Sequence, residues 1–79
     1  MESVLARVNQ VFQELFDDED LVIVRETIAA DVAGWDSVMH VRLMLQLEKA
    51  FRIRFHSSEV ASLTNVGDLI DLIEAKRIN

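Results

Sequence analysis

The sequence predicts an all-α fold: a four-helix bundle of three main helices and one short helix, with a long loop between the first two main helices. About half of the residues, 51%, are hydrophobic, and they recur at steps of three and four along three stretches. The chain has no proline and only two glycines, so short strands joined by tight turns are disfavoured. We expect one domain, residues 1–79.

The first predicted helix covers residues 3–16, with Ser3 as its N-cap. Its apolar stripe is Val4, Leu5, Val8, Val11, Phe12, Leu15 and Phe16. We expect the polar residues between them, including Asn9 and Gln13, to face solvent. Four acids from Asp17 to Asp20 oppose the helix dipole and predict the end of the helix.

Residues 17–36 are predicted to form an ordered loop. The segment 21–24 has strand-like composition, but the sequence offers no convincing second strand to pair with it, so we reject a sheet. A connection of about twenty residues needs anchors, and we expect Ile23 and Ile28 to insert into the core. Residues 27–31 are expected to form a single helical turn.

The second helix is predicted at residues 37–51, with Asp36 as its N-cap. One stripe consists of Leu43, Leu47 and Phe51, with Met44 beside it. A second stripe consists of Val38, Val41, Arg42, Leu45 and Lys49. Because both stripes carry apolar residues, two interpretations stay open. The helix is packed on two sides, or one stripe meets a partner protein.

A linker anchored by Ile53 and Phe55 is expected to follow. Ser57 or Ser58 is expected to cap a short helix that runs through Leu63, with Val60 and Leu63 pointing inward.

Asn65 is predicted to cap the last helix, with Asp68 at the third helical position in a capping-box-like arrangement. The buried stripe of this helix is Val66, Leu69, Ile70 and Ile73. Lys76 and Arg77 lie in the last turn, where cations are favoured.

The composition limits the possible functions. Without cysteine the chain forms no disulfide and no thiolate metal site. The net charge of −6 argues against nucleic-acid binding, although residues 32–56 hold two acids and four bases and are locally basic. No apolar stretch has transmembrane length and no signal peptide is evident, so we expect a cytoplasmic monomer.

Ser37 stands at the start of the strongest helical pattern. Unpaired N–H groups and the helix dipole favour an anion such as a phosphate at that position. We therefore interpret Ser37 as a covalent attachment point and not as a catalytic nucleophile. His40 lies at i+3, so a Ser–His dyad is thinkable, but the chain has no room for a substrate pocket and an oxyanion hole. Trp35 is expected to anchor the loop, and we assign no catalytic residue and no metal ligand.

The segment Gly34-Trp35-Asp36-Ser37-Val38 resembles the acyl carrier proteins and the related peptidyl carrier domains. The motif of that family is Asp-Ser-Leu, with Val38 here in place of leucine. The apolar positions that follow match without gaps: Leu43, Leu47, Phe51, Phe55, Val60, Leu63, Leu69 and Ile73. The segment 27–32 is similar to the loop ahead of the motif, with about one extra residue.

The resemblance implies that a phosphopantetheinyl transferase moves 4′-phosphopantetheine from coenzyme A to Ser37. Asp36 caps the helix beside it. The thiol of the arm would carry acyl groups as thioesters between acyl-loading and acyl-processing enzymes of fatty acid or polyketide biosynthesis. The protein itself would be a carrier and not an enzyme.

The chain departs from the fatty-acid carriers on its second helix. Arg42 and Lys49 stand at positions that are usually acidic in them. We expect the partner face to be Val38, Met39, Val41, Arg42, Leu45 and Lys49. Because charge complementarity governs partner choice, a freestanding carrier of a specialised polyketide or modified-acyl pathway is our interpretation. The alternatives are a peptidyl carrier of nonribosomal peptide synthesis, a helical interaction module without a prosthetic group, and a small hydrolase that uses Ser37 and His40.

Overall fold

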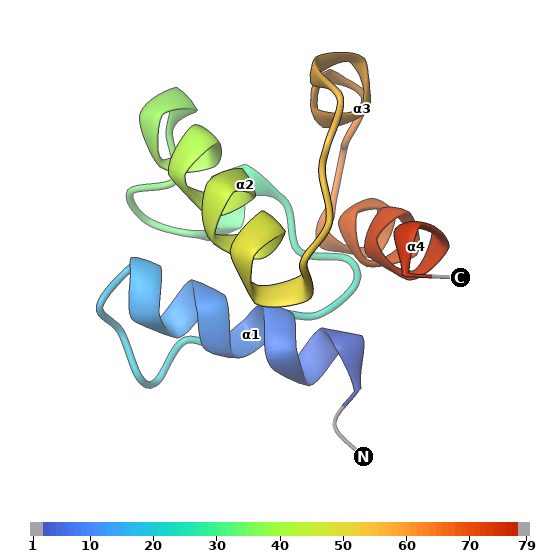
Figure 1. The fold of residues 1–79 in the computed structure, drawn as a ribbon. Helices are drawn as coiled ribbons and strands as arrows, with labels where there is room; N and C mark the ends of the chain where they lie inside the picture. Colours follow the sequence, from blue (N-terminus) through green and yellow to red (C-terminus); the bar gives the residue numbers. More distant parts are fainter. Residues whose placement is uncertain (1–2, 78–79) are drawn as a thin grey trace.

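The computed structural model describes residues 3–77, and that part of the chain holds four α-helices and no strand. The helices are α1 (Val4–Leu15), α2 (Ser37–Phe51), α3 (Ser57–Ala61) and α4 (Val66–Lys76). A 3₁₀ turn, Ala29–Asp31, interrupts the first loop. Figure 1 shows α1 running across the molecule beneath α2, with α4 beside them and the short α3 at the periphery. The predicted four-helix bundle with a long first loop is confirmed.

Three of the four helix starts are capped as the sequence predicts. Ser3 Oγ accepts a hydrogen bond from the N–H of Ala6 at 3.0 Å. Asn65 Oδ1 accepts one from the N–H of Asp68 at 2.8 Å, and the carboxylate of Asp68 in turn accepts the N–H of Thr64 at 3.2 Å. The third cap, at α2, belongs to the site described below.

The start of α3 differs from the prediction. Ser57 and Ser58 lie inside the helix, and His56 occupies the N-cap position. The carboxylate of Glu59, at the third helical position, accepts the N–H of His56 at 2.8 Å, and no serine side chain caps the helix. The helix also ends at Ala61 and not at Leu63.

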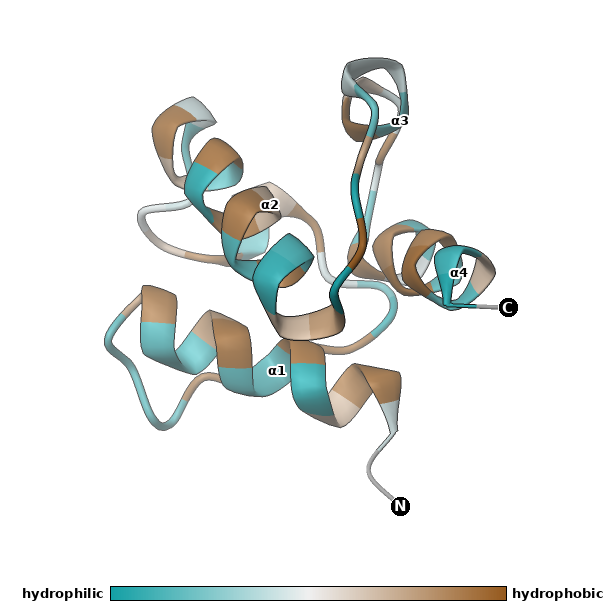
Figure 2. Cartoon of the chain, viewed as in Figure 1, coloured by the Kyte–Doolittle hydropathy of each residue, from teal (hydrophilic) through white to brown (hydrophobic). Residues whose placement is uncertain are grey.

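The core lies where α1, α2 and α4 meet. Its fully buried side chains include Phe12 from α1, Leu43 and Leu47 from α2, and Ile73 from α4. Helix α1 contacts both α2 and α4, and its apolar stripe faces α2 in Figure 2. The buried stripe predicted for α4 is confirmed by Val66, Leu69, Ile70 and Ile73.

The first loop is held against α1 by two polar side chains. The N–H of Ile23 donates to Asn9 Oδ1 at 2.7 Å, and Gln13 Nε2 donates to the carbonyl of Leu21 at 3.0 Å. The expectation that Asn9 and Gln13 face solvent is therefore wrong, since both are half-buried under the loop. Ile23 inserts into the core as predicted, with 2% of its surface exposed.

Ile28 does not insert into the core, contrary to the prediction, because 43% of its surface is exposed. Its N–H donates to the carboxylate of Asp31 at 3.0 Å, which closes the 3₁₀ turn. The chain then returns inward at Val32, which is 6% exposed. Thr27 is also buried, and its hydroxyl accepts the N–H of Val24 at 2.9 Å, so this buried polar group has a hydrogen-bond partner.

The same loop satisfies the first turn of α4. The carbonyl of Thr27 accepts the N–H of Val66 at 2.9 Å, and the carbonyl of Arg25 accepts the N–H of Gly67 at 2.7 Å. A Cβ at Gly67 would lie 3.1 Å from the Arg25 oxygen, so only glycine allows this approach without a shift. An ion pair between Arg25 and Asp71, at 3.0 Å, adds a second link between loop and helix.

The linker after α2 is anchored as predicted by Ile53 and Phe55, which are half-buried against the core. Arg52 ends α2 in a left-handed conformation with φ of 56°. Glu48 then accepts the N–H of Phe55 at 2.8 Å. This carboxylate therefore fixes the path of the chain toward α3.

Candidate functional site

Ser37 is the first residue of α2 and is exposed. A turn delivers the chain to it: the N–H of Trp35 donates to the carbonyl of Val32 at 3.2 Å, and that of Asp36 to the carbonyl of Gly34 at 3.1 Å. Gly34 has a φ of 86°, a conformation that favours glycine. The turn places the serine hydroxyl at a helix start that is open to a partner enzyme.

Asp36 caps α2 as predicted. Its Oδ1 accepts the N–H of Met39 at 2.9 Å and its carbonyl accepts the N–H of His40 at 2.8 Å. The N–H groups of Ser37 and Val38 have no acceptor within residues 3–77. Two donors and the positive end of the helix dipole therefore remain available to a phosphate at Ser37.

Trp35 anchors the loop before the serine, as expected. Its ring meets Phe12 edge to face at a centroid distance of 5.2 Å and also contacts Phe16 at 6.5 Å. Its Nε1–H donates to His40 Nδ1 at 3.1 Å, and the centroids of the two rings lie 6.0 Å apart with 19° between their planes. These contacts fix both the loop and the imidazole on α2.

The Ser–His dyad is not formed. His40 Nδ1 already accepts the indole proton, and the hydroxyl of Ser37 has no hydrogen-bond partner within residues 3–77. No group of three acidic or histidine side chains in that part of the chain is arranged to hold a metal ion. The site therefore offers an accessible hydroxyl beside free N–H donors, without a base to activate it.

The predicted partner residues lie along the outward side of α2. The exposed fractions are 63% for Val38, 59% for Val41 and 56% for Leu45. Arg42 and Lys49 are exposed on the same helix, while Met39 is half-buried. The structure thus leaves an apolar strip with flanking cations uncovered, beginning at the residue after Ser37.

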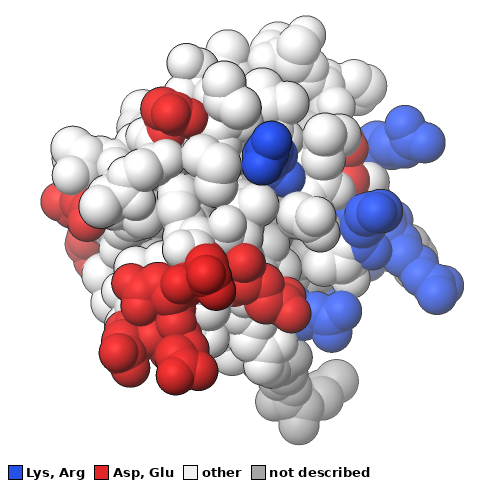
Figure 3. Space-filling view, turned by 90° about the vertical axis from the view of Figure 1, so that its left-hand side faces the viewer, with Lys and Arg blue, Asp and Glu red and all other residues white. Residues whose placement is uncertain are grey.

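On the face drawn in Figure 3, acidic side chains gather on one part of the surface, and most of the Lys and Arg side chains lie on another part. Within residues 3–77 the ion pairs are Arg25–Asp71, at 3.0 Å, and Lys76–Glu59, at 2.9 Å. Arg42 and Lys49 have no acidic partner among those residues, so their charges are available to another molecule.

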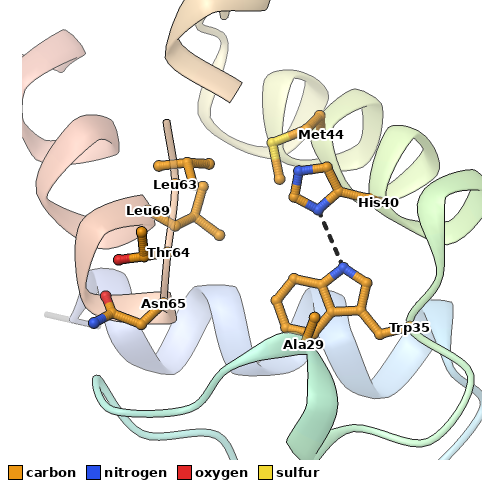
Figure 4. A pocket seen from close by; sticks show the side chains of 8 residues that line it. All are labelled: Ala29, Trp35, His40, Met44, Leu63, Thr64, Asn65 and Leu69. Carbon is orange, nitrogen blue, oxygen red and sulfur yellow. Dashed lines mark hydrogen bonds between the residues drawn. The ribbon is translucent and has the colours of Figure 1, made fainter. Parts of the chain in front are cut away.

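A small cavity of about 60 Å³ lies behind the site (Figure 4). Trp35 and His40 line one side of it, and Leu63 and Leu69 face them from the other. An open groove of about 570 Å³ runs between α2 and α3 and is lined by Val41, Leu45, Phe55 and Val60, among others. The sequence pattern gave no signal for either space, because both arise between separate segments.

Ser37 is thus an exposed serine that begins the central helix of a small four-helix bundle. The chain belongs to the family described as "Phosphopantetheine attachment site", whose model matches residues 4–73. It is 24% identical over 75 residues to an acyl carrier protein of Thermotoga maritima, covering 95% of this chain and 93% of that protein.

A solved relative has the same fold. The solution NMR structure of a holo acyl carrier protein from Geobacter metallireducens superposes with a TM-score of 0.87 and is 41% identical. The match covers 92% of this chain and 84% of that one.

These similarities decide between the hypotheses. The chain is an acyl carrier protein that bears covalently attached 4′-phosphopantetheine, and it is not an enzyme. It works with a phosphopantetheinyl transferase and with synthase enzymes. The hydrolase and the module without a prosthetic group are therefore wrong. No helix within residues 3–77 is long and apolar enough to cross a membrane.

Proposed function

We propose that Ser37 carries the phosphopantetheine and that residues 1–79 form one carrier domain. The observation that carries this proposal is the exposed hydroxyl of Ser37 at the capped start of α2. The free N–H groups of Ser37 and Val38 suit a phosphodiester at that oxygen. Asp36 stabilises the first turn of α2, since its carboxylate accepts a hydrogen bond from the N–H of Met39.

Loading would make Ser37 Oγ the nucleophile that a transferase activates. The oxygen bonds to the phosphorus nearest the pantetheine, and the pyrophosphate bond of coenzyme A breaks. Adenosine 3′,5′-bisphosphate leaves, and the hydroxyl proton is released. The attached arm supplies the thiol on which a thioester forms. The chain itself contains no cysteine and so has no thiol of its own.

Intact-mass measurement tests the attachment site. Incubation with coenzyme A, Mg²⁺ and a promiscuous transferase is expected to add one phosphopantetheinyl group to the wild-type protein and none to Ser37→Ala. Ser58→Ala is the matched control, because Ser58 is also exposed in the first turn of a helix. Retained modification in Ser37→Ala would move the site elsewhere.

We propose further that the outward side of α2 is the partner face, formed by Val38, Met39, Val41, Arg42, Leu45 and Lys49. Its apolar strip supports burial against a partner, and the unpaired cations favour an enzyme with an acidic patch beside an apolar groove. The strip starts next to Ser37, so a docked enzyme would lie close to the arm.

The charge of this face supports a specialised polyketide or modified-acyl pathway, since it differs from the acidic helix of fatty-acid carriers that the sequence otherwise resembles. A peptidyl carrier of nonribosomal peptide synthesis is the second candidate. Mass spectrometry of the arm on protein isolated from its own host distinguishes them. An aminoacyl thioester would contradict the assignment to a polyketide or modified-acyl pathway, and an acyl or ketoacyl thioester would support it.

A further inference from the structure

Three arginines line one pocket at the far end of α2 from Ser37. Arg7 belongs to α1, Arg52 follows the last residue of α2, and Arg77 follows α4. Ser37 and Phe51 are the first and last residues of α2, which puts about 21 Å between them along the helix axis. The arginine pocket is therefore separate from the proposed attachment point.

The ring of Phe51 holds two of these guanidinium groups in place. Arg7 Cζ lies 5.9 Å from the ring centroid, and Arg77 Cζ lies 5.4 Å from it. Both distances are within the range of a cation–π contact. Arg7 Nη2 also donates to the carbonyl of Ala50 at 3.2 Å. Two of the three cations are thus positioned before any ligand binds.

The positive charge of the arginine pocket is not balanced by acidic side chains. No Asp or Glu lines it, and none of its arginines has an ion-pair partner within residues 3–77. Acids are not scarce, because the chain has 14 of them against eight Lys and Arg, and Arg25 and Lys76 are both paired. Like charges that share one pocket repel each other, and an anion bound between them relieves that repulsion. The arginine pocket therefore has the charge of an anion site.

The number of donors and their charge favour a phosphate group as the anion. A phosphate monoester carries roughly two negative charges at neutral pH and has three terminal oxygens that accept hydrogen bonds. Each guanidinium presents a fork of N–H donors that matches these oxygens. A carboxylate has one charge and two oxygens, so it would leave part of the three-arginine set without an acceptor.

The size of the arginine pocket also suits a phosphate group. Its volume is about 200 Å³, which is room for roughly six water molecules at roughly 30 Å³ each. A phosphate group, with four oxygens around one phosphorus, occupies less than that. Ser3 lines the same pocket, and its Oγ accepts the N–H of Ala6, so its hydroxyl hydrogen remains a further donor.

We propose that Arg7, Arg52 and Arg77 form a binding site for a phosphate monoester. The bound phosphate joins the first turns of α1 to the ends of α2 and α4. None of the residues of the proposed partner face lines this pocket, so the site is distinct from that face. It is also independent of which residue bears the arm.

The test titrates methyl phosphate into the full chain with its arm attached, while sodium chloride keeps the ionic strength constant. Nuclear magnetic resonance follows the backbone amides and the Nε–H signals of the arginines. We expect saturable shifts at the three pocket arginines and none at Arg42, which is exposed outside the pocket. Acetate is expected to bind at least about tenfold more weakly, because it has fewer charges and fewer oxygens.

Two variants test the arginines directly. Arg52→Gln and Arg77→Gln should each weaken methyl phosphate binding about tenfold, since each removes one charge and its hydrogen bonds to the anion. Arg54→Gln is the matched control, because it removes the same charge from an exposed residue that does not line the pocket. Arg52 and Arg77 are exposed, so both variants are expected to fold, and thermal unfolding without ligand checks this. Methyl phosphate should raise the unfolding temperature of the wild type more than that of either variant.

Saturable binding that the two pocket variants lose and Arg54→Gln keeps would support the proposal. Equal weakening by Arg54→Gln, or shifts of equal size at Arg42, would overturn it, since either would mean that methyl phosphate senses only the general positive charge. Shifts confined to Val38, at the start of α2, would also overturn it. Acetate that binds as tightly as methyl phosphate would contradict the assignment to a phosphate. A glutamate-rich peptide that binds the pocket more tightly than methyl phosphate would overturn it in favour of an acidic segment of a partner protein.

Discussion

The two sides of α2 carry similar apolar residues but differ in burial: one side is buried and the other is exposed. On the inner side Leu43 and Leu47 are fully buried in the core, which also includes residues of α1 and α4. On the outer side Val41 and Leu45 are more than half exposed, at 59% and 56%. Burial stabilises the fold through the first pair, while the second pair keeps apolar surface available for another protein. One helix thus serves as the centre of the core and as the proposed partner face.

The largest expected difference between the two sides is in stability. Leu47→Ala should lower the free energy of unfolding by about 2–5 kcal/mol, because it removes buried methyl groups and leaves a cavity. Leu45→Ala, the same substitution two residues earlier, should change it by no more than about 0.5 kcal/mol. Urea denaturation measures both. Similar losses for the two variants would mean that the outer side is also packed.

An intermediate effect is expected on partner binding. Arg42→Glu combined with Lys49→Glu should slow association with the cognate acyl-loading enzyme about tenfold at low salt, and the difference should shrink as salt rises. Thermal unfolding should stay nearly unchanged, since neither cation has an ion-pair partner within residues 3–77.

The control for this variant is Glu19→Lys combined with Glu26→Lys. Both side chains are exposed in the first loop and make no hydrogen bond within residues 3–77. Unchanged association in the Arg42 and Lys49 variant would show that these cations are only solvated surface. A general effect of net charge would instead make the control bind faster.

The smallest expected effect is on the stability of the fold at low pH. It concerns the start of α4, a helix that contributes residues to the same core as the inner side of α2. The Thr64 hydroxyl and N–H lower the pKa of Asp68 below 3.8, and the hydrogen bond from Lys76 lowers the pKa of Glu59 below 4.5. A lowered pKa in the folded state contributes stability above the unfolded pKa. That stability is lost as the pH falls through the folded value.

Asp68→Asn should therefore flatten the decline of stability as the pH falls below about 4, measured by urea denaturation at successive pH values. Glu74→Gln is the control, because Glu74 is exposed on the same helix and its side chain makes no hydrogen bond within residues 3–77. Equal flattening in both variants would assign the acid sensitivity to net charge and not to the cap of α4.

Much of the fold and of the site follows from local sequence. The caps Ser3, Asp36 and Asn65 and the bounds of α2 depend on short-range hydrogen bonds and on helical periodicity, so they can be predicted from neighbouring residues. Ser37 stands out for the same reason, because its place at a helix start is a local property. The start of α3 was mispredicted although it is local, since Glu59 accepts the N–H of His56 and His56 occupies the N-cap position in place of a serine.

The tertiary structure decided what depends on distant segments. Asn9 looks like a solvent-side residue until the loop folds over it and uses its carbonyl oxygen. Ile28 and Val32 are both apolar, and only the turn closed by Asp31 determines that the second is buried. The hydrogen bond between Trp35 and His40 joins residues five positions apart, but the cavity that both line is completed by Leu63 and Leu69 from the last third of the chain.

The sequence by itself therefore determined the helices, their caps and the serine that we propose receives the arm, since these depend on residues within one or two turns of each other. It left open which stripe of α2 would be covered, because both stripes are apolar enough to be buried. Packing of α1 against α2, in a core that α4 completes, resolved that choice, since Leu43 and Leu47 are buried there. One side of α2 lies on the core, and the other side, the proposed partner face, stays exposed.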